Sequence, residues 1–289
     1  MSNNYSNESA DRATTFPLAH TNTIAQAFDL LAEAHDAFVF QAQDLYTVRL
    51  RELLTAHLVT VPCGAYILDM GGGSGQWALD FAHAGYKVVL SDISPRMLWY
   101  ACTHLTSADQ IQLVCADALK PPFQPGVFQV VMLVGDVLSY LDQPAEALRA
   151  LAKTGGADTL FIGTVISRIG LVIKLLRIGD SAGAWQLLRS GYAIERTKAD
   201  LAFLAAKQEQ AEPVAHLAFR GYTAHELRTI FAASGLQLNI VAGLNVFKSL
   251  GIMRTSTISS RVVLDCERWI STCGLWPDLS TNLFFAARA

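Results

Sequence analysis

Charged residues are scarce in this chain of 289 residues: they make up 16% of it, against about a quarter in typical soluble domains. Hydrophobic residues make up 52%. So little charge excludes a long coiled coil, and so much apolar surface excludes a chain that is disordered throughout. A formal net charge of −3 gives no support for a nucleic-acid partner held through its phosphates. We therefore expect a folded protein that does not bind nucleic acid.

An export signal is also missing. Residues 1–23 are polar, rich in Ser, Asn and Thr, and lack an apolar stretch, so we predict a disordered tail there. The chain has 5 cysteines, and none of them forms a Cys-x-x-Cys pair. These features predict a cytoplasmic protein with reduced, mostly buried thiols and no metal site.

The apolar excess raises the question of a membrane span, and the longest stretch without charge is Thr229–Phe247. Ser234-Gly235 in its middle is a turn signal, and Asn and Gln residues follow it. We therefore interpret the stretch as the end of a helix, a turn and a buried strand, and predict no transmembrane segment.

Strand and helix patterns alternate from residue 65 onwards. Continuous apolar runs predict strands at 65–70, 87–92, 111–117, 127–136 and 158–165, with further strands at 236–243 and 282–289. Continuous apolar strands that alternate with helices are typical of a parallel sheet covered on both faces. The predicted fold is α/β: a Rossmann-like, doubly wound, mostly parallel sheet of seven strands.

Two helical regions lie outside this alternation. Residues 24–58 show helical spacing and are predicted to form an amino-terminal lid. Residues 166–221 are helical in composition and carry eight Lys or Arg against five Asp or Glu, a net +3, so they are predicted to be a helical cap inserted after the fifth strand. We expect one domain over 24–289; an oligomer is compatible with the sequence.

A glycine-rich loop follows the first predicted strand, with the sequence Asp69-Met-Gly-Gly-Gly-Ser-Gly75. Glycines at this place let a ligand approach the main chain closely, and ligands of open parallel sheets bind at the carboxyl ends of the strands. The loop also satisfies a loose dinucleotide pattern, with Asp92 at a suitable distance for a ribose. However, Asp69 suits a ligand with an ammonium group, and it opposes a pyrophosphate.

The segment from Ile67 to Leu98, ILDMGGGSGQWALDFAHAGYKVVLSDISPRML, resembles the class I S-adenosylmethionine-dependent methyltransferases. Its D-x-G-x-G-x-G motif and its second strand, which ends in an acid before I-S-P-x-M-L, carry the resemblance. The resemblance implies that Asp69 and the backbone of Gly71, Gly73 and Gly75 hold the methionine part of S-adenosylmethionine. It also implies that Asp92 accepts hydrogen bonds from the ribose hydroxyls.

Five more cofactor contacts follow from the same resemblance. Ile93 would pack on the adenine, and Asp117 with Ala118 would meet its amino edge. Gly135 and Asp136 would lie by the sulfonium and the acceptor entrance. Simpler interpretations remain open: Asp117 could form a turn, and Asp136 could be an acid at the start of a helix.

Two residues are candidate catalytic groups. His216 could be a general base because histidine titrates near neutral pH, and Tyr140 could line the acceptor site; an ordinary structural role remains open for both. The sequence GDVLSYL after the fourth strand lacks the Asn/Asp-Pro-Pro-Tyr/Phe motif of enzymes that methylate amino groups of DNA bases and glutamine.

The predicted function is methyl transfer from S-adenosylmethionine, with S-adenosylhomocysteine as product, to a small and largely hydrophobic metabolite. Methyl transfer mainly needs alignment and exclusion of water, which a lid and an apolar cap can provide. Three alternatives remain open: a non-catalytic protein that binds the cofactor, an enzyme that uses the cofactor without transferring methyl, and a dinucleotide-dependent oxidoreductase.

Overall fold

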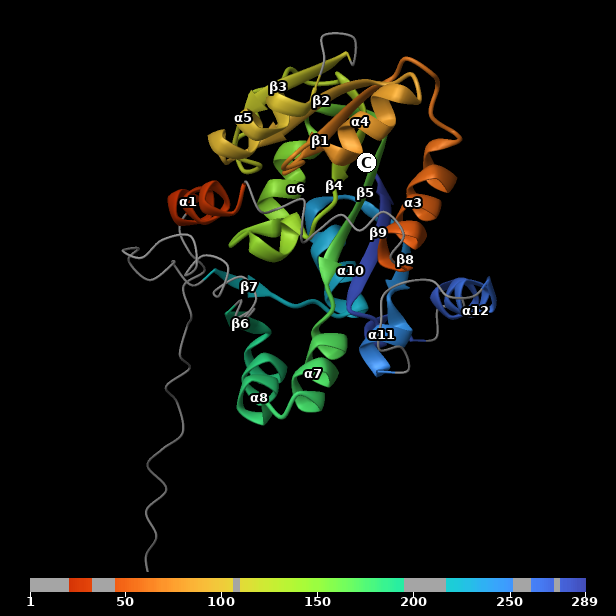
Figure 1. Ribbon diagram of the computed structural model, residues 1–289. Helices are drawn as coiled ribbons and strands as arrows, with labels where there is room; N and C mark the ends of the chain where they lie inside the picture. Colours follow the sequence, from red (N-terminus) through yellow and green to blue (C-terminus); the bar gives the residue numbers. More distant parts are fainter. Residues whose placement is uncertain (1–20, 33–44, 106–109, 195–216, 252–260, 273–275) are drawn as a thin grey trace, which may run out of the picture.

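The computed structural model describes residues 21–32, 45–105, 110–194, 217–251, 261–272 and 276–289. Seven strands of the described residues form one sheet in the order β3-β2-β1-β4-β5-β9-β8 (Figure 1). These strands are β1 (Tyr66–Met70), β2 (Lys87–Asp92), β3 (Ile111–Cys115), β4 (Phe128–Leu133), β5 (Gly155–Ile166), β8 (Gln237–Leu244) and β9 (Asn282–Arg288).

Strands β1 to β5 run parallel to one another, and β9 runs antiparallel to both of its neighbours, β5 and β8. The prediction of a mostly parallel, seven-stranded sheet is therefore confirmed. The order of the strands reverses between β1 and β4, which is the switch point at which open sheets bind ligands. In the centre of the sheet, Asp69 of β1 lies in register with Leu90 of β2 and Met132 of β4.

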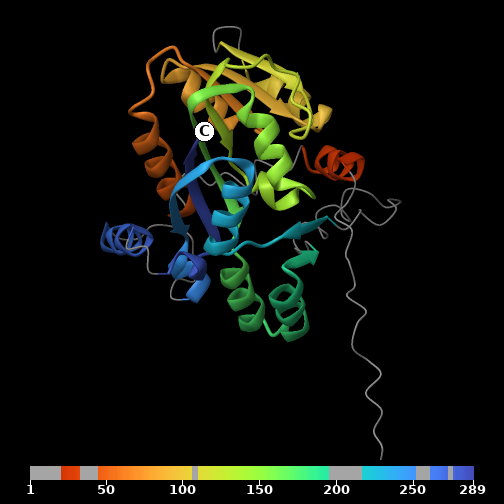
Figure 2. The same cartoon turned by 180° about the vertical axis from the view of Figure 1, so that it is seen from behind.

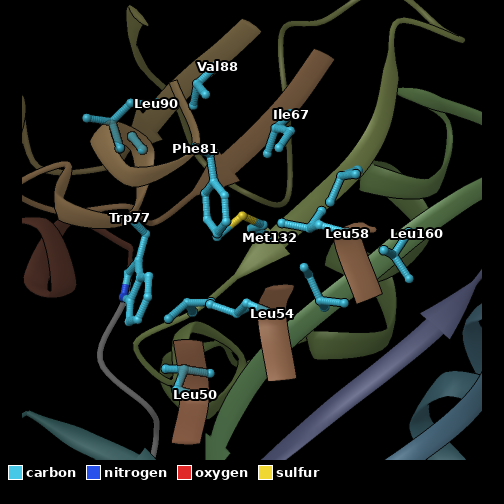
Figure 3. Packing of buried hydrophobic residues seen from close by; sticks show 14 of the residues in the cluster. Leu50, Leu54, Leu58, Ile67, Trp77, Phe81, Val88, Leu90, Met132 and Leu160 are labelled. Atoms are coloured by element: carbon cyan, nitrogen blue, oxygen red, sulfur yellow. The ribbon is translucent and has the colours of Figure 1, made fainter. Parts of the chain in front are cut away.

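Helices cover both faces of the sheet. One face packs against α3 (Leu45–Leu58), α4 (Gln76–His83) and α5 (Pro95–His104), and the other against α6 (Pro144–Ala152) and α10 (Ala224–Ser234). Figure 3 shows the first face, where leucines of α3 meet Trp77 and Phe81 of α4 over the strands. This two-sided burial accounts for much of the apolar excess in the sequence.

The two helices of the amino-terminal region lie at different places. α1 (Thr21–Leu31) packs beside α5, whereas α3 packs on the sheet (Figures 1 and 2). Residues 21–23, predicted as part of a disordered tail, are the first turn of α1, so that part of the prediction is wrong; residues 1–20 lie outside the described residues.

The described part of 166–221 contains more than helices. α7 (Arg168–Arg177) and α8 (Ser181–Ser190) form a hairpin, and β6 (Tyr192–Ile194) pairs antiparallel with β7 (Ala218–Arg220). The described part of the insert is therefore mainly helical, as predicted, with one short strand pair that the sequence did not indicate. The two strands are only three residues each, and their alternation is too short to stand out against the helix-favouring composition around them.

The stretch Thr229–Phe247 has the predicted helix end, turn and strand, but the strand is buried only in its last three residues because β8 lies at the edge of the sheet. α10 ends at Ser234, Gly235 follows with φ 82°, and β8 begins at Gln237. Beyond β8, α11 (Val246–Leu250), α12 (Arg261–Thr272) and the short helix η2 (Pro277–Leu279) lead to β9. No helix among the described residues is both long and apolar enough to cross a bilayer.

The prediction of mostly buried cysteines is wrong. Cys63, Cys102, Cys115 and Cys266 are exposed, and Cys273 lies outside the described residues. They occupy a loop, the outer faces of two helices and the end of the edge strand β3, places from which a small side chain faces outwards.

Candidate functional site

The loop from β1 to α4 turns sharply at its glycines. Gly71, Gly73 and Gly75 have φ angles of 72°, 56° and 84°, in the left-handed region that a residue with a Cβ atom rarely adopts. The loop begins at the carboxyl end of β1, next to the switch point of the sheet. The three predicted glycines therefore form one turn where a ligand of this fold class would lie.

The N–H groups of this loop already have partners within the protein. Gly71 and Gly72 donate to a carbonyl oxygen at the end of β2, at 2.6 and 3.2 Å. Gly73 donates to Oδ2 of Asp92 at 2.9 Å, and Gly75 donates to the carbonyl of Gly72 at 3.0 Å. The glycines therefore offer a ligand close approach to the main chain rather than free N–H donors.

Gly72 is part of the site although the sequence reasoning passed over it. A Cβ atom at Gly72 would lie 2.1 Å from Cδ1 of Leu90 and 2.6 Å from Oδ2 of Asp69. At Gly71, a Cβ atom would lie 2.6 Å from Cγ2 of Val137. Both contacts are too short for a side chain, so the loop and the end of β4 pack tightly. The run of three glycines was the signal for this position.

Asp69 is a buried carboxylate without a hydrogen-bond partner among the described residues. Its side chain is 1% exposed, and neither Oδ1 nor Oδ2 finds a donor there. Burial, followed by the negative charge of Asp92, raises the pKa of Asp69 to about 7. A buried acid of this kind is costly unless a cation or donor joins it. A positively charged ligand group at the end of the central strand would therefore stabilise the Asp69 carboxylate.

Asp92 lies at the end of β2, with its carboxylate oriented by two backbone groups. Oδ2 accepts from the N–H of Gly73, and Oδ1 accepts from the N–H of Ser94 at 2.8 Å. Ser94 itself caps α5, since its Oγ accepts from Met97 N–H at 3.0 Å. An ionised carboxylate has about four acceptor positions, so Asp92 can also accept from ligand hydroxyls.

Three residues predicted to contact the adenine, Ile93, Asp117 and Ala118, follow the ends of β2 and β3. Asp117 follows β3, and its Oδ1 accepts from the N–H of Leu119 at 2.9 Å, so it does form the turn that the simpler interpretation proposed. Ala118 is buried against the sheet core, and Ile93 is half-buried. A contact of Asp117, Ala118 and Ile93 with an adenine ring stays a prediction.

Asp136 follows β4 in a strained conformation, with φ 63°, directly after Gly135 with φ 84°. Its Oδ2 accepts from Nδ2 of Asn282 in β9 at 2.7 Å, whereas its buried Oδ1 has no partner among the described residues. Thr164 of β5 accepts from the N–H groups of Gly135 and Asp136, at 3.2 and 3.1 Å. Burial raises the pKa of Asp136 to about 6, against the opposing effect of hydrogen bonds from Thr164 and Asn282.

Asn282 and Thr164 are site residues that the sequence reasoning missed. Nothing local marks them, because isolated polar residues of this kind are common in strands and no motif surrounds them. Only the antiparallel pairing of β9 with β5 brings Asn282 to the end of β4. Asp136, which Asn282 contacts, has the αL backbone conformation. This conformation costs a residue other than glycine of order 1 kcal/mol or more, so it indicates a constraint set by the site.

Aromatic side chains gather beside these strand ends. Tyr140, in the short helix η1 (Val137–Tyr140), meets Phe28 of α1 edge to face, with ring centroids 5.5 Å apart, and Phe219 of β7 at 6.5 Å. Ile93 and Leu217 belong to the same apolar cluster. Tyr140 is therefore placed among apolar side chains from three distant parts of the chain.

A polar contact holds α1 over this cluster. Oδ1 of Asp29 accepts from Oγ of Ser94 at 2.5 Å and from the N–H of Arg96 at 3.1 Å. Both donors belong to the amino-terminal end of α5, where a negative charge is favourable. The sequence reasoning missed Asp29 as well. His216, the other candidate catalytic residue, lies outside the described residues, so its role stays a prediction.

Residues 67–156 match the family model described as a methyltransferase domain. The chain is 29% identical over 139 residues to a demethylmenaquinone methyltransferase of Clavibacter sepedonicus, a match of 46% of this chain and 55% of that enzyme. It is 31% identical over 116 residues to a ubiquinone/menaquinone biosynthesis C-methyltransferase of Ectopseudomonas oleovorans, a match of 37% of this chain and 68% of that enzyme. The chain belongs to the class I S-adenosylmethionine-dependent methyltransferases.

The matches to the curated relatives are partial, since the chain spans about half the length of some of them. Among solved structures, the crystal structure of a [4+2]-cyclase has the same fold, with a TM-score of 0.59 and 14% identity over 94% of this chain and 98% of that one. That fold neighbour is named for a cyclase activity, so the fold alone does not specify methyl transfer.

The cofactor of this methyltransferase family fits the site on the chemistry of its residues. An ammonium group is the partner that the buried Asp69 lacks. The glycine loop leaves no room for side chains, and the carboxylate of Asp92 is a hydrogen-bond acceptor of the kind that ribose hydroxyls need. A dinucleotide would instead bring a pyrophosphate to Asp69, which its charge opposes.

Proposed function

We propose that the chain transfers a methyl group from S-adenosylmethionine to a small, largely apolar acceptor. The observation that carries the proposal is the cluster of Phe28, Tyr140 and Phe219 beside the strand ends that bear Asp92 and Asp136. These rings would hold an apolar acceptor molecule next to Asp136, which we propose below as the base that takes its proton. The predicted insert 166–221, to which β7 and its Phe219 belong, would cover the acceptor.

S-adenosylmethionine, when bound, supplies an electrophilic methyl carbon on a sulfonium sulfur. The task of the protein is to align the acceptor with that carbon and to exclude water. Asp69 would hold the amino group and Asp92 the ribose. Asp29 would keep α1 in place over the site, because its two hydrogen bonds fix α1 to the start of α5.

Asp136 would accept the proton that the acceptor loses as its new bond to the methyl carbon forms. Three features support this role: Oδ1 has no partner among the described residues, Asn282 holds Oδ2, and the αL backbone fixes the direction of the side chain. With a pKa of about 6, the carboxylate is ionised at neutral pH and still basic enough to act. Tyr140 would position the acceptor, and His216 remains a predicted alternative base.

The names of the relatives supply the first acceptors to assay. They act in quinone biosynthesis, and one is named for demethylmenaquinone. A quinol ring carries an acidic proton and an apolar body, which suits both a carboxylate base and a cluster of aromatic side chains. We therefore propose a quinol-like aromatic ring as the acceptor class.

The proposal is tested by release of S-adenosylhomocysteine in the presence of a demethylated quinol. We expect turnover that is lost in Asp92→Ala and kept in Asp158→Ala, a change at an exposed aspartate outside the site. Binding of S-adenosylhomocysteine by calorimetry separates the two parts of the proposal. Binding without turnover on any apolar acceptor would refute methyl transfer, and absence of binding would refute the assignment of the cofactor site.

A further inference from the structure

The α7–α8 hairpin is a firmly anchored projection at one end of the molecule (Figures 1 and 2). Its base is fixed because the N–H of Arg168 donates to the carbonyl of Tyr222 at 2.9 Å and its guanidinium pairs with Glu226 at 2.6 Å. Between the two helices, Val172, Ala184 and Leu187 form a small core of their own. The hairpin is therefore a rigid unit.

The outer side of this hairpin exposes large apolar side chains. Leu176 is 55% exposed, Ile178 70%, Trp185 61% and Leu188 43%. Ile178 stands at the turn between the helices, and Trp185 lies about one helical turn into α8. None of these four side chains belongs to the hairpin core. Exposed groups of this size on a rigid tip are typical of a docking surface.

The charge of the same hairpin is distinctly positive. Residues 168–190 contain four Arg or Lys and one acid, a net +3, in a chain whose net charge is −3. Lys174 and Arg189 are exposed, and the guanidinium of Arg189 lies 5.9 Å from the ring centroid of Trp185. Arg177 instead reaches α11, where its guanidinium donates to the carbonyls of Lys248 and Ser249 at 3.1 and 3.0 Å. The acid, Asp180, caps α8 by accepting from Gly183 N–H at 2.8 Å. Its charge is therefore partly offset by the helix dipole.

Bulky apolar side chains with basic residues beside them suit an anionic lipid surface. The apolar groups enter the boundary between headgroups and acyl chains, tryptophan prefers that depth, and each basic residue gains from the negative surface potential. A nucleic acid would match the charge but not Leu176, Ile178 and Leu188. The hairpin follows the carboxyl end of β5, which is the end of the sheet where the site lies, so docking there would bring the site close to the lipid.

We propose that the α7–α8 hairpin docks the protein on anionic membranes, with Ile178 and Trp185 inserted at the interface and Lys174 and Arg189 held against the headgroups. This surface is separate from the cofactor site, and the proposal does not depend on the reaction. It concerns attachment to one leaflet, not a crossing of the bilayer.

The test is cosedimentation of the full chain with phosphatidylcholine vesicles, with and without phosphatidylglycerol. We expect binding that requires phosphatidylglycerol, weakens at high salt, and falls by about tenfold or more in Ile178→Glu/Trp185→Glu. Trp99→Glu is the matched control, because Trp99 is 62% exposed on α5, outside the hairpin. An unchanged affinity for S-adenosylhomocysteine would show that the variants are folded.

Three results would overturn the proposal. The first is no binding of the unmodified chain to either vesicle. The second is a loss in Trp99→Glu equal to that in the double variant. The third is a dimer in gel filtration without lipid that the double variant converts to a monomer, together with vesicle binding that the double variant leaves unchanged. In that case the surface joins two copies of the chain.

Discussion

Replacement of Asp69 by asparagine should make the protein more stable and weaken its cofactor site. The carboxylate is 1% exposed and has no partner among the described residues, so at neutral pH and above an uncompensated charge is buried at the end of β1. Asparagine has nearly the same shape and no charge. The change therefore removes an electrostatic cost of folding together with the charge that a bound ammonium group needs.

The magnitude follows from the pKa of Asp69, which burial raises from 3.8 to about 7. This difference of about 3 units corresponds to about 4 kcal/mol at about 1.4 kcal/mol per unit. Because the pKa is raised on folding, the cost is fully present above pH 7 and disappears as the pH falls towards 3.8. A buried amide without partners costs about 1–3 kcal/mol. The protonated carboxyl of Asp69 carries a similar cost in the unmodified protein, so this term nearly cancels. Asp69→Asn should thus gain about 4 kcal/mol at pH 8 and little near pH 4.

The assay is urea unfolding of the cofactor-free protein at a series of pH values, with Asp158→Asn as an exposed control. Calorimetry with S-adenosylhomocysteine should show affinity reduced by about a hundredfold, as expected when a buried charge loses its partner. Stability and affinity must change in opposite directions. A variant that is less stable than the unmodified protein at pH 8, or that binds the ligand equally well, would refute the reasoning.

Three further predictions concern the surroundings of Asp69. Gly72→Ala should lower the free energy of unfolding in urea by about 1–3 kcal/mol and weaken cofactor binding, because the new Cβ atom would overlap Leu90. Gly156→Ala is the control: nothing lies within 4 Å of a Cβ atom there, so neither quantity should change. Asp29→Ala should speed amide exchange in α1 by about fivefold or more, since two hydrogen bonds to α5 are lost, and unchanged exchange would contradict the role of Asp29 in holding α1. Activity should fall as the pH drops through about 6, because Asp136 becomes protonated there. Asp136→Asn should lower kcat by about a hundredfold and remove this pH dependence. A pH profile that survives in the variant would point to another base.

Local sequence signals were sufficient to place Asp69, the glycine loop and Asp92 at one edge of the sheet. Asp69, the glycines and Asp92 lie within one strand-loop-helix-strand unit, where each position follows from chain geometry. A sharp turn after a buried strand requires glycine, and two neighbouring parallel strands end at the same edge. The cap of α5 by Ser94 and the turn at Gly235 were readable for the same reason: each depends on residues only a few positions apart.

The acceptor side could not be read in this way. Phe28, Tyr140 and Phe219 come from α1, η1 and β7, and no spacing in the sequence connects them. Asn282 reaches Asp136 across 146 positions of the chain. The short strands β6 and β7 and the exposed cysteines were predicted wrongly because composition reports an average over a segment, whereas burial depends on what the rest of the chain brings against each residue.

The α/β class, the parallel sheet and the glycine loop at the end of β1 follow from the sequence alone, because periodicity and turn chemistry act over a few residues. The tertiary structure decided which polar atoms are buried without a partner, which aromatic rings meet, and that the positive hairpin after β5 turns its apolar side chains outwards. These properties arise from contacts between distant segments. They determine whether a residue such as Asp136 is an ordinary acid at a helix start or a strained carboxylate suited to accept a proton.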